Sequence, residues 1–149
     1  MSKDYPLTPE EFDAIYSKVP RLTVEVIVTN DKGEIYLTKR AIEPCKGQWH
    51  LPGGTVFFGE SLLQAVQRVA QRELGIEVVS THHKGYIEYP SHYLNGMDEP
   101  VGLVFDVTQY KGELKPNAEA DAGGWYSSLP DPMHADQDEY LVREGYLTR

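Results

Sequence analysis

The segment between residues 53 and 76 contains glycines, two carboxylates and an arginine at spacings that could build a site. The residues of interest are Gly53, Gly54, Glu60, Arg68, Glu73 and Gly75. A loop carbonyl and carboxylates from a following helix can converge on one hard cation, because such a cation prefers oxygen ligands. Magnesium held in this way bridges substrate phosphates and neutralises charge that develops on a leaving group. The chemistry open to this stretch is therefore metal-assisted hydrolysis of a substrate that contains phosphate.

The segment from Ser61 to Leu74 is predicted to be the helix that positions these side chains. Its apolar residues recur at helical spacing, and Gly75 suits the left-handed position that ends a helix. Glu60 and Arg68 lie about two helical turns apart, so we expect a charged pair that braces the segment.

A second, shorter helix is predicted near the N-terminus, within residues 8–19. Thr8 is a suitable N-cap, Pro9 stands at the first helical position, and Glu11 completes a capping box. Pro20 ends the helix, because proline disfavours a helical conformation in the residue before it.

The remaining segments predict an α/β fold. Residues 21–29 and 34–39 flank a turn at 30–33 and are expected to pair as a β-hairpin. Further strands are expected at 49–51, 76–80, 83–89, 101–110 and 124–127, with a loop at 90–100 and a C-terminal helix at 135–146. This order indicates a mixed β-sheet sandwiched between helices, in a single domain over residues 1–149.

The charge of the chain restricts its partners. A net charge of −9 argues against nucleic acid and anionic membranes, since both require clustered lysine and arginine. No apolar run approaches the roughly 20 residues that cross a bilayer, and no signal peptide is recognised, so we expect a cytoplasmic protein. A phosphate substrate would need local positive charge from a metal ion or a few arginines. Cys45, the single cysteine, is predicted to be a packing residue rather than a metal ligand.

The stretch that ends at Ile76 resembles the Nudix box, G-x5-E-x7-R-E-U-x-E-E-x-G-U, in which U is a bulky aliphatic residue. Six of nine fixed positions agree, namely Gly54, Glu60, Arg68, Glu73, Gly75 and Ile76. The preceding R-x3-P-x2-G-x-W-x2-PGG segment, from Arg40 to Gly54, also has a form usual in that family. The resemblance implies the Nudix fold and a hydrolase that uses Mg²⁺ or Mn²⁺. It also implies that the Gly53 carbonyl and the Glu73 carboxylate bind the metal.

Three positions depart from the box: Val69, Ala70 and Arg72. Ordinary Nudix pyrophosphohydrolases carry glutamates at the positions of Val69 and Arg72, where they bind further metals or activate water. Valine has no ligand atom and arginine repels a cation, so we expect one helix carboxylate and one metal ion. Arg72 either contacts a substrate phosphate or lies on the solvent side of the helix.

The sequence is most similar to the GDP-mannose mannosyl hydrolase branch of the family, whose box also lacks those glutamates. These enzymes attack the anomeric carbon of the sugar and release a nucleoside diphosphate. The resemblance implies that Arg40 binds the substrate and assists the leaving group, and that Glu119 is a third metal ligand with a catalytic role. Glu25 matches an acid on the first strand of that branch and is predicted to be catalytic and to contact substrate, with a solvent-facing position as the alternative.

Two further residues differ from that branch. Its general-base histidine would stand at Ala120, and a tyrosine near the leaving group would stand at about Pro100. Glu119 itself, Asp121, or a group of the 90–100 loop such as His92 or Asp98 could replace the base, although a lone loop histidine is more often solvated. His82, His83 and His134 have no motif around them.

Aromatic side chains offer surfaces on which a nucleotide base could stack. The candidates are Phe12, Tyr16, Trp49 and Tyr93. In the mannosyl hydrolase branch the N-terminal segment exchanges between subunits. Phe12, in the segment 8–19, is therefore expected to contribute to a partner's nucleotide pocket in a homodimer.

Three functions compete. The first is Mg²⁺-dependent hydrolysis of a nucleoside-diphosphate sugar at the anomeric carbon, as in the GDP-mannose mannosyl hydrolases. The second is pyrophosphohydrolysis of a phosphoanhydride in a nucleotide or sugar nucleotide. The third is nucleotide binding with little turnover, which a shared fold permits. The first is favoured because it accounts for the incomplete box, whereas no motif identifies the base or the sugar.

Overall fold

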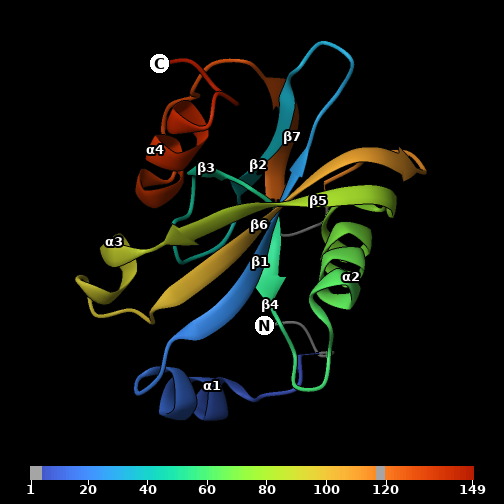
Figure 1. Ribbon diagram of the computed structural model, residues 1–149. Helices are drawn as coiled ribbons and strands as arrows, with labels where there is room; N and C mark the ends of the chain where they lie inside the picture. Colours follow the sequence, from blue (N-terminus) through green and yellow to red (C-terminus); the bar gives the residue numbers. More distant parts are fainter. Residues whose placement is uncertain (1–4, 117–119) are drawn as a thin grey trace.

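The computed structural model describes residues 5–116 and 120–149, and its strands form two sheets (Figure 1). The larger sheet has the order β4 (Gly53–Thr55), β1 (Arg21–Val28), β6 (Pro100–Lys111) and β5 (Glu77–Glu88). β1 and β6 are parallel, whereas the other neighbours are antiparallel, so the sheet is mixed. The smaller sheet is antiparallel, with β2 (Ile35–Arg40) between β3 (Trp49–His50) and β7 (Ala120–Tyr126).

The predicted hairpin of the first two strands is wrong. β1 and β2 belong to different sheets and are connected by an isolated bridge between Thr29 and Ile35. Because β4 and β6 occupy both edges of β1, neither edge can accept β2. The local turn pattern was correct, but it could not reveal that distant strands compete for the same edges.

Two helices cover opposite sides of the strands, α2 (Leu62–Leu74) and α4 (Ala135–Arg143) (Figure 1). Ser61 and Gln64 form a capping box at the start of α2, and Gly75 ends it with a φ of 70°. The buried face of α2 packs in one core with Val24, Val26 and Val28 of β1. Side chains alternate along a strand, so Ile27 points to the other core, with Leu141 of α4. The α/β fold with strands between helices is confirmed.

The N-terminal helix α1 (Pro9–Tyr16) has the predicted capping box between Thr8 and Glu11. It ends three residues before Val19, and none of its residues is buried. Its Phe12 and Tyr16 rings face Arg21, with their centres 5.3 and 6.0 Å from the guanidinium carbon. Homodimer formation through residues 8–19 stays a prediction.

Two local predictions differ from the structure. The segment expected to be a loop at 90–100 contains a short helix, α3 (Pro90–Tyr93). The two strands expected between residues 76 and 89 are one strand, β5, with irregular pairing after Val78, Ser80 and His83. Bulges shift the alternation of side chains, which makes one irregular strand resemble two regular ones. Within residues 5–116 and 120–149, no helix has the length and apolarity needed to cross a membrane.

Candidate active site

A cavity of about 390 Å³ brings together most of the residues that the sequence singled out. Phe12, Glu25, Arg40, Gly53 and Glu73 all line it, although they come from α1, β1, β2, β4 and α2. Glu119 lies outside the described residues. Five side chains or backbone positions that are distant in the sequence therefore share one concave site, which is the usual form of a small-molecule site.

Charge in the cavity lining differs from charge over the whole chain. The protein has 14 lysine and arginine residues against 23 aspartate and glutamate residues. The lining residues with formal charge are the cations Arg21, Arg40, Arg68 and Arg72 and the acids Glu25, Glu43, Glu73 and Asp98. With four cations and four acids the lining has no net formal charge, whereas the whole chain carries −9, and its arginines can meet a phosphate ligand.

Glu25 is buried in this site rather than exposed to solvent, with 6% of its surface accessible. Its Oε1 accepts hydrogen bonds from the hydroxyls of Thr23, at 3.0 Å, and Tyr89, at 2.8 Å. Two glycines make room for the carboxylate. A Cβ atom on Gly53 would overlap its Oε2, and one on Gly102 would lie 2.7 Å from its Oε1. Glu25 therefore stands directly against the Gly53 backbone.

A chain of hydrogen bonds connects Glu25 to α4. The Leu51 amide donates to Gln137 Oε1 at 2.8 Å, and Gln137 Nε2 donates to the Tyr89 hydroxyl at 2.9 Å. The hydroxyl in turn donates to Glu25. Sequence analysis missed Tyr89 and Gln137, because neither belongs to a motif and they lie on separate elements. Burial raises the pKa of Glu25 to about 7, although these hydroxyl contacts oppose the shift.

Replacing Glu25 by Gln should remove a pH dependence of folding stability. The carboxyl pKa rises from 4.5 in the unfolded chain to about 7 in the folded protein. Between these values the folded protein retains a proton that the unfolded chain releases. The stabilising contribution is therefore complete below pH 4.5 and is lost as the pH rises through 7. This loss is about 3 kcal/mol.

Urea unfolding at pH 4.5 and about pH 8 measures this effect. We expect the fall in unfolding free energy between the two conditions to be about 3 kcal/mol smaller in Glu25→Gln than in the wild type. Glu88→Gln, which changes an exposed acid on β5, is the matched control and should behave as the wild type. Equal falls in wild type and Glu25→Gln would show that Glu25 is not the titrating group.

The face of α2 that borders the cavity carries one carboxylate. Val69, Arg72 and Glu73 line the cavity, and Glu73 is the single acid between Leu62 and Leu74. Val69 is buried, and a Cβ on Gly54 would lie 3.2 Å from its Cγ2. Arg72 thus borders the site instead of lying on a distant solvent face. The helix supplies packing and positive charge where the family usually supplies metal ligands.

Glu60 and Arg68 form the charged pair that the sequence predicted, with 2.7 Å between Glu60 Oε2 and Arg68 Nε. Arg68 also donates to the Thr55 carbonyl at 2.6 Å, and its guanidinium carbon lies 3.6 Å from the centre of the Phe57 ring. Glu60 accepts a hydrogen bond from the Phe57 amide. The pair therefore ties the loop before α2 to the end of β4, which is a structural role.

Arg40 lines the cavity from the end of β2 and is anchored by its own loop. Its Nε donates to the carbonyls of Pro44, at 2.6 Å, and Ile42, at 3.3 Å. Across the smaller sheet, Ala120 is the partner of Arg40. The position at which the mannosyl hydrolase branch carries its general base is therefore adjacent to the arginine that we expect to assist the leaving group.

Three histidines line the cavity, His50, His92 and His134, and the preference for a solvated His92 is wrong. His92 and His134 are 8% and 5% exposed, and their Nε2 atoms lie 3.1 Å apart. Burial and the neighbouring His92 lower the pKa of His134 to about 4. Burial lowers the pKa of His50 to about 3, so it is a neutral imidazole at physiological pH. These histidines come from β3, α3 and the start of α4, and their sequence spacing carried no signal.

Of the four aromatic candidates for base stacking, Phe12 borders the cavity of its own chain. Tyr16 packs behind it, with ring centres 4.8 Å apart. Trp49 packs against Tyr126 in the core, and Tyr93 is 47% exposed on α3. Tyr5, which the sequence did not indicate, adds a second ring to the lining next to Phe12.

The donor atoms expected to bind magnesium fit a hard cation. Gly53 offers a backbone carbonyl and Glu73 a carboxylate, and both residues line the cavity. Oxygen ligands of these two kinds are those that Mg²⁺ prefers, with water and substrate phosphates completing its coordination. Glu73 stands in the last turn of α2, whose buried face and αL cap hold that turn against β1.

Comparison with known proteins identifies the family. The model of the NUDIX domain matches residues 19–144. The low-salt glycan biosynthesis protein Agl8 of Haloferax volcanii is 36% identical over 136 residues, which cover 89% of this chain and 86% of that protein. The human 8-oxo-dGDP phosphatase NUDT18 is 31% identical over 130 residues, 80% of this chain. This chain spans just over a third of that human protein, 36% of its length.

Solved structures share the fold. The MutT NUDIX hydrolase from Burkholderia pseudomallei superimposes with a TM-score of 0.76 and 28% sequence identity, over 84% of this chain and 97% of that one. The NUDIX-domain match over residues 19–144 includes the strands of both sheets and α2, and the box positions Gly54, Arg68, Val69, Arg72 and Glu73 line the cavity described above. The chain therefore belongs to the Nudix family and is a Nudix hydrolase.

Proposed function

We propose that this Nudix hydrolase cleaves a nucleoside-diphosphate sugar, as the GDP-mannose mannosyl hydrolases do, by attack of water on the anomeric carbon. The observation that carries the proposal is the composition of α2 at the cavity. Val69 and Arg72 occupy positions that hold metal-binding glutamates in relatives that attack phosphorus, and Glu73 is the one helix carboxylate. Attack at carbon requires neutralisation of a departing diphosphate, for which one cation and arginines suffice.

The residues that bind the leaving group are at hand. The Gly53 carbonyl and Glu73, with Glu119 as the third ligand that the family resemblance implies, would hold Mg²⁺, and the bound ion would neutralise charge on the diphosphate. Arg40 and Arg72, both in the cavity lining, supply further positive charge. Because loop carbonyls anchor one edge of the Arg40 guanidinium, its orientation is set before the substrate binds.

Glu25 accepts the proton of the attacking water. Its pKa of about 7 matches the proton-acceptor role near neutral pH, and its Oε2 lies beside Gly53. The water oxygen bonds to the anomeric carbon as the bond from that carbon to the phosphate oxygen breaks. The bonding electron pair leaves with the nucleoside diphosphate, and the products are that diphosphate and the free sugar.

The names of the relatives bear on the choice between hydrolysis at the anomeric carbon and cleavage at phosphorus. The name of the Haloferax volcanii relative refers to glycan biosynthesis, in which sugars are the building blocks, and this favours a sugar-nucleotide substrate. The name of the human relative is 8-oxo-dGDP phosphatase, which favours cleavage at phosphorus. Pyrophosphohydrolysis is therefore the second candidate, with the same metal ligands and the same arginines.

Hydrolysis in ¹⁸O-labelled water separates the two candidates. The protein is incubated with Mg²⁺ and either GDP-mannose, other nucleoside-diphosphate sugars or nucleoside triphosphates, and the products are analysed by mass spectrometry. We expect the label in the free sugar. Label in a phosphate product would overturn the proposal and establish pyrophosphohydrolysis, and absence of turnover on every sugar nucleotide would also overturn it. A sample with chelator in place of Mg²⁺ controls for spontaneous hydrolysis.

A further inference from the structure

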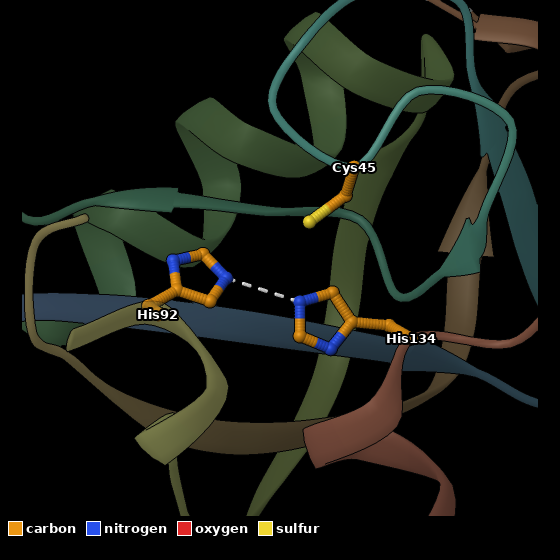
Figure 2. Close-up of side chains that lie close together, drawn as sticks. All are labelled: Cys45, His92 and His134. Atoms are coloured by element: carbon orange, nitrogen blue, oxygen red, sulfur yellow. Dashed lines mark hydrogen bonds between the residues drawn. The ribbon is translucent and has the colours of Figure 1, made fainter. Parts of the chain in front are cut away.

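We propose that Cys45, His92 and His134 form a binding site for one zinc ion, separate from the magnesium ligands Gly53 and Glu73. Figure 2 shows the Cys45 thiol pointing toward the two imidazole rings. One ligand atom from each residue can be chosen so that all three lie within 4.8 Å of one another. The residues come from the 41–48 loop, α3 and the residue that caps α4, so the fold assembles them from three distant segments.

The spacing of the ligand atoms suits zinc. The two Nε2 atoms are 3.1 Å apart. Two nitrogens bound to one tetrahedral Zn²⁺ at about 2.0–2.1 Å are themselves roughly 3.3 Å apart. A thiolate and two imidazoles are ligands of borderline and soft cations, whereas magnesium requires oxygen. The site and the magnesium ligands therefore select different metals within one cavity.

Neighbouring residues orient His92 as a metal ligand. Its Nδ1 lies 3.3 Å from Asp98 Oδ1, and Asp98 accepts a hydrogen bond of 2.6 Å from Arg21 Nε. A carboxylate that holds the outer nitrogen of a ligating histidine is common at zinc sites. The contact with Asp98 orients the Nδ1 proton of His92 toward the carboxylate and its Nε2 lone pair toward the proposed zinc position.

His134 has to change its hydrogen bonding when the metal binds. Its Nδ1 accepts a hydrogen bond from the Asp136 amide at 3.2 Å, which assigns its proton to Nε2. That proton points at the His92 Nε2 lone pair and occupies the place of the cation. Zinc at this position would displace that proton, so that His134 carries its proton on Nδ1 and the Asp136 amide loses its acceptor, while the Cys45 thiol would release its proton to solvent. The Asp136 amide, in the first turn of α4, therefore indicates whether the zinc site is occupied.

The loop that carries Cys45 is built to hold the thiol in this position. Cys45 has a φ of 63°, which is uncommon for a residue other than glycine. The backbone groups of Arg40 bond to Gln48 and Gly47, at 3.0 and 2.8 Å, and close the loop around it. Cys45, for which the sequence predicts a packing role, also lines the cavity.

Three protein ligands leave a fourth position on a tetrahedral ion. All three residues line the cavity, so this position opens to the space that the substrate occupies, and a water molecule or a substrate oxygen can fill it. The proposal does not depend on attack at carbon, because the ligands are present whichever bond the enzyme cleaves.

Titration of the reduced, metal-free protein with cobalt(II) chloride tests the site while Mg²⁺ is kept in excess. We expect one equivalent of Co²⁺ to give the visible absorption of a tetrahedral ion and a near-ultraviolet charge-transfer band that requires a thiolate. Zinc chloride should displace the Co²⁺. Cys45→Ser should abolish the charge-transfer band, and His134→Ala should weaken Co²⁺ binding by tenfold or more, on the order of losses seen at metal sites.

Two variants control for binding of Co²⁺ outside the proposed zinc site. His82→Ala removes an exposed histidine and Glu73→Gln removes a magnesium ligand, and both should leave the cobalt bands unchanged. In a ¹⁵N spectrum of the wild type, zinc should shift the Asp136 amide, a readout that does not depend on the folding of any variant. No charge-transfer band in the wild type, an undiminished band in Cys45→Ser, or an unmoved Asp136 amide would each overturn the site.

Discussion

Replacing Glu73 by Gln should reduce magnesium-dependent turnover by on the order of 100-fold or more. Loss of a residue that merely supports a metal ligand costs roughly 10- to 100-fold, so loss of a ligand should cost at least as much. Glu73 is the one carboxylate that α2 brings to the cavity, and therefore no neighbour on the helix can take its place. Initial rates measured over a range of Mg²⁺ concentrations should show a raised requirement for the metal.

Glu77→Gln is the matched control for this change. Glu77 lies four residues after Glu73, is exposed, and stands at the start of β5 outside the cavity lining. The Glu77→Gln substitution removes one negative charge, as Glu73→Gln does. It should leave turnover within about twofold of the wild type, as expected for surface substitutions. Unchanged magnesium-dependent activity in Glu73→Gln would show that the proposed metal site is wrong.

Arg40→Ala should lower kcat by roughly 100-fold while it weakens substrate binding much less. A donor that stabilises charge developing on the leaving group acts mainly in the transition state, and losses of about this size follow its removal. Arg40 stands at the end of β2, beside Ala120 of β7, with its guanidinium held by loop carbonyls. Steady-state kinetics together with calorimetric binding of the nucleoside-diphosphate product separate the two effects.

Lys39→Ala is the control for the loss of positive charge near the site. Lys39 precedes Arg40 on β2 but does not line the cavity. Because Lys39 lies outside the cavity lining, its replacement changes the charge near the site without removing a contact with the substrate. If Arg40→Ala weakened binding and left kcat intact, Arg40 would be a binding residue and its leaving-group role would be wrong.

Zinc bound at Cys45, His92 and His134 would act in the same cavity as these two residues. A second cation in the cavity would change the electrostatic field that the substrate meets. Kinetic measurements on Glu73 and Arg40 variants therefore require a defined content of both metals. Chelation followed by return of Mg²⁺ alone, or of Mg²⁺ with Zn²⁺, separates the contributions of the two sites.

The local pattern of the sequence was enough for the helices that carry the box and for most strands. The Ser61 capping box, the apolar spacing of α2 and the αL residue Gly75 act within a few residues of one another, so their effect is visible in the sequence. The Glu60–Arg68 pair likewise joins residues only eight positions apart, one in the loop before α2 and one on the helix. The resemblance to the Nudix box then placed Gly53 and Glu73 at one site, and the structure puts both in the cavity lining.

Tertiary structure alone decided how β1 and β2 are paired and which side chains surround Glu25. Strands that are far apart in the chain compete for the edges of β1, and no local turn signal records the outcome. Tyr89 and Gln137 lie 64 and 112 residues from Glu25 in the sequence, yet they meet it in the fold. Burial in these surroundings raises the pKa of Glu25, although the hydrogen bond from Tyr89 opposes the shift.

The same distinction holds for the cluster of Cys45, His92 and His134. Each residue is isolated in the sequence, with a neighbourhood that predicts packing or solvation, and a ligand set with no regular spacing leaves no motif. The fold brings their side chains together because the 41–48 loop, α3 and the cap of α4 meet at one end of the cavity. The sequence by itself determined α1 and α2, whose caps and apolar spacing act between near neighbours, and its motif indicated the family. The chemistry of the site depends on contacts between residues that only folding makes neighbours.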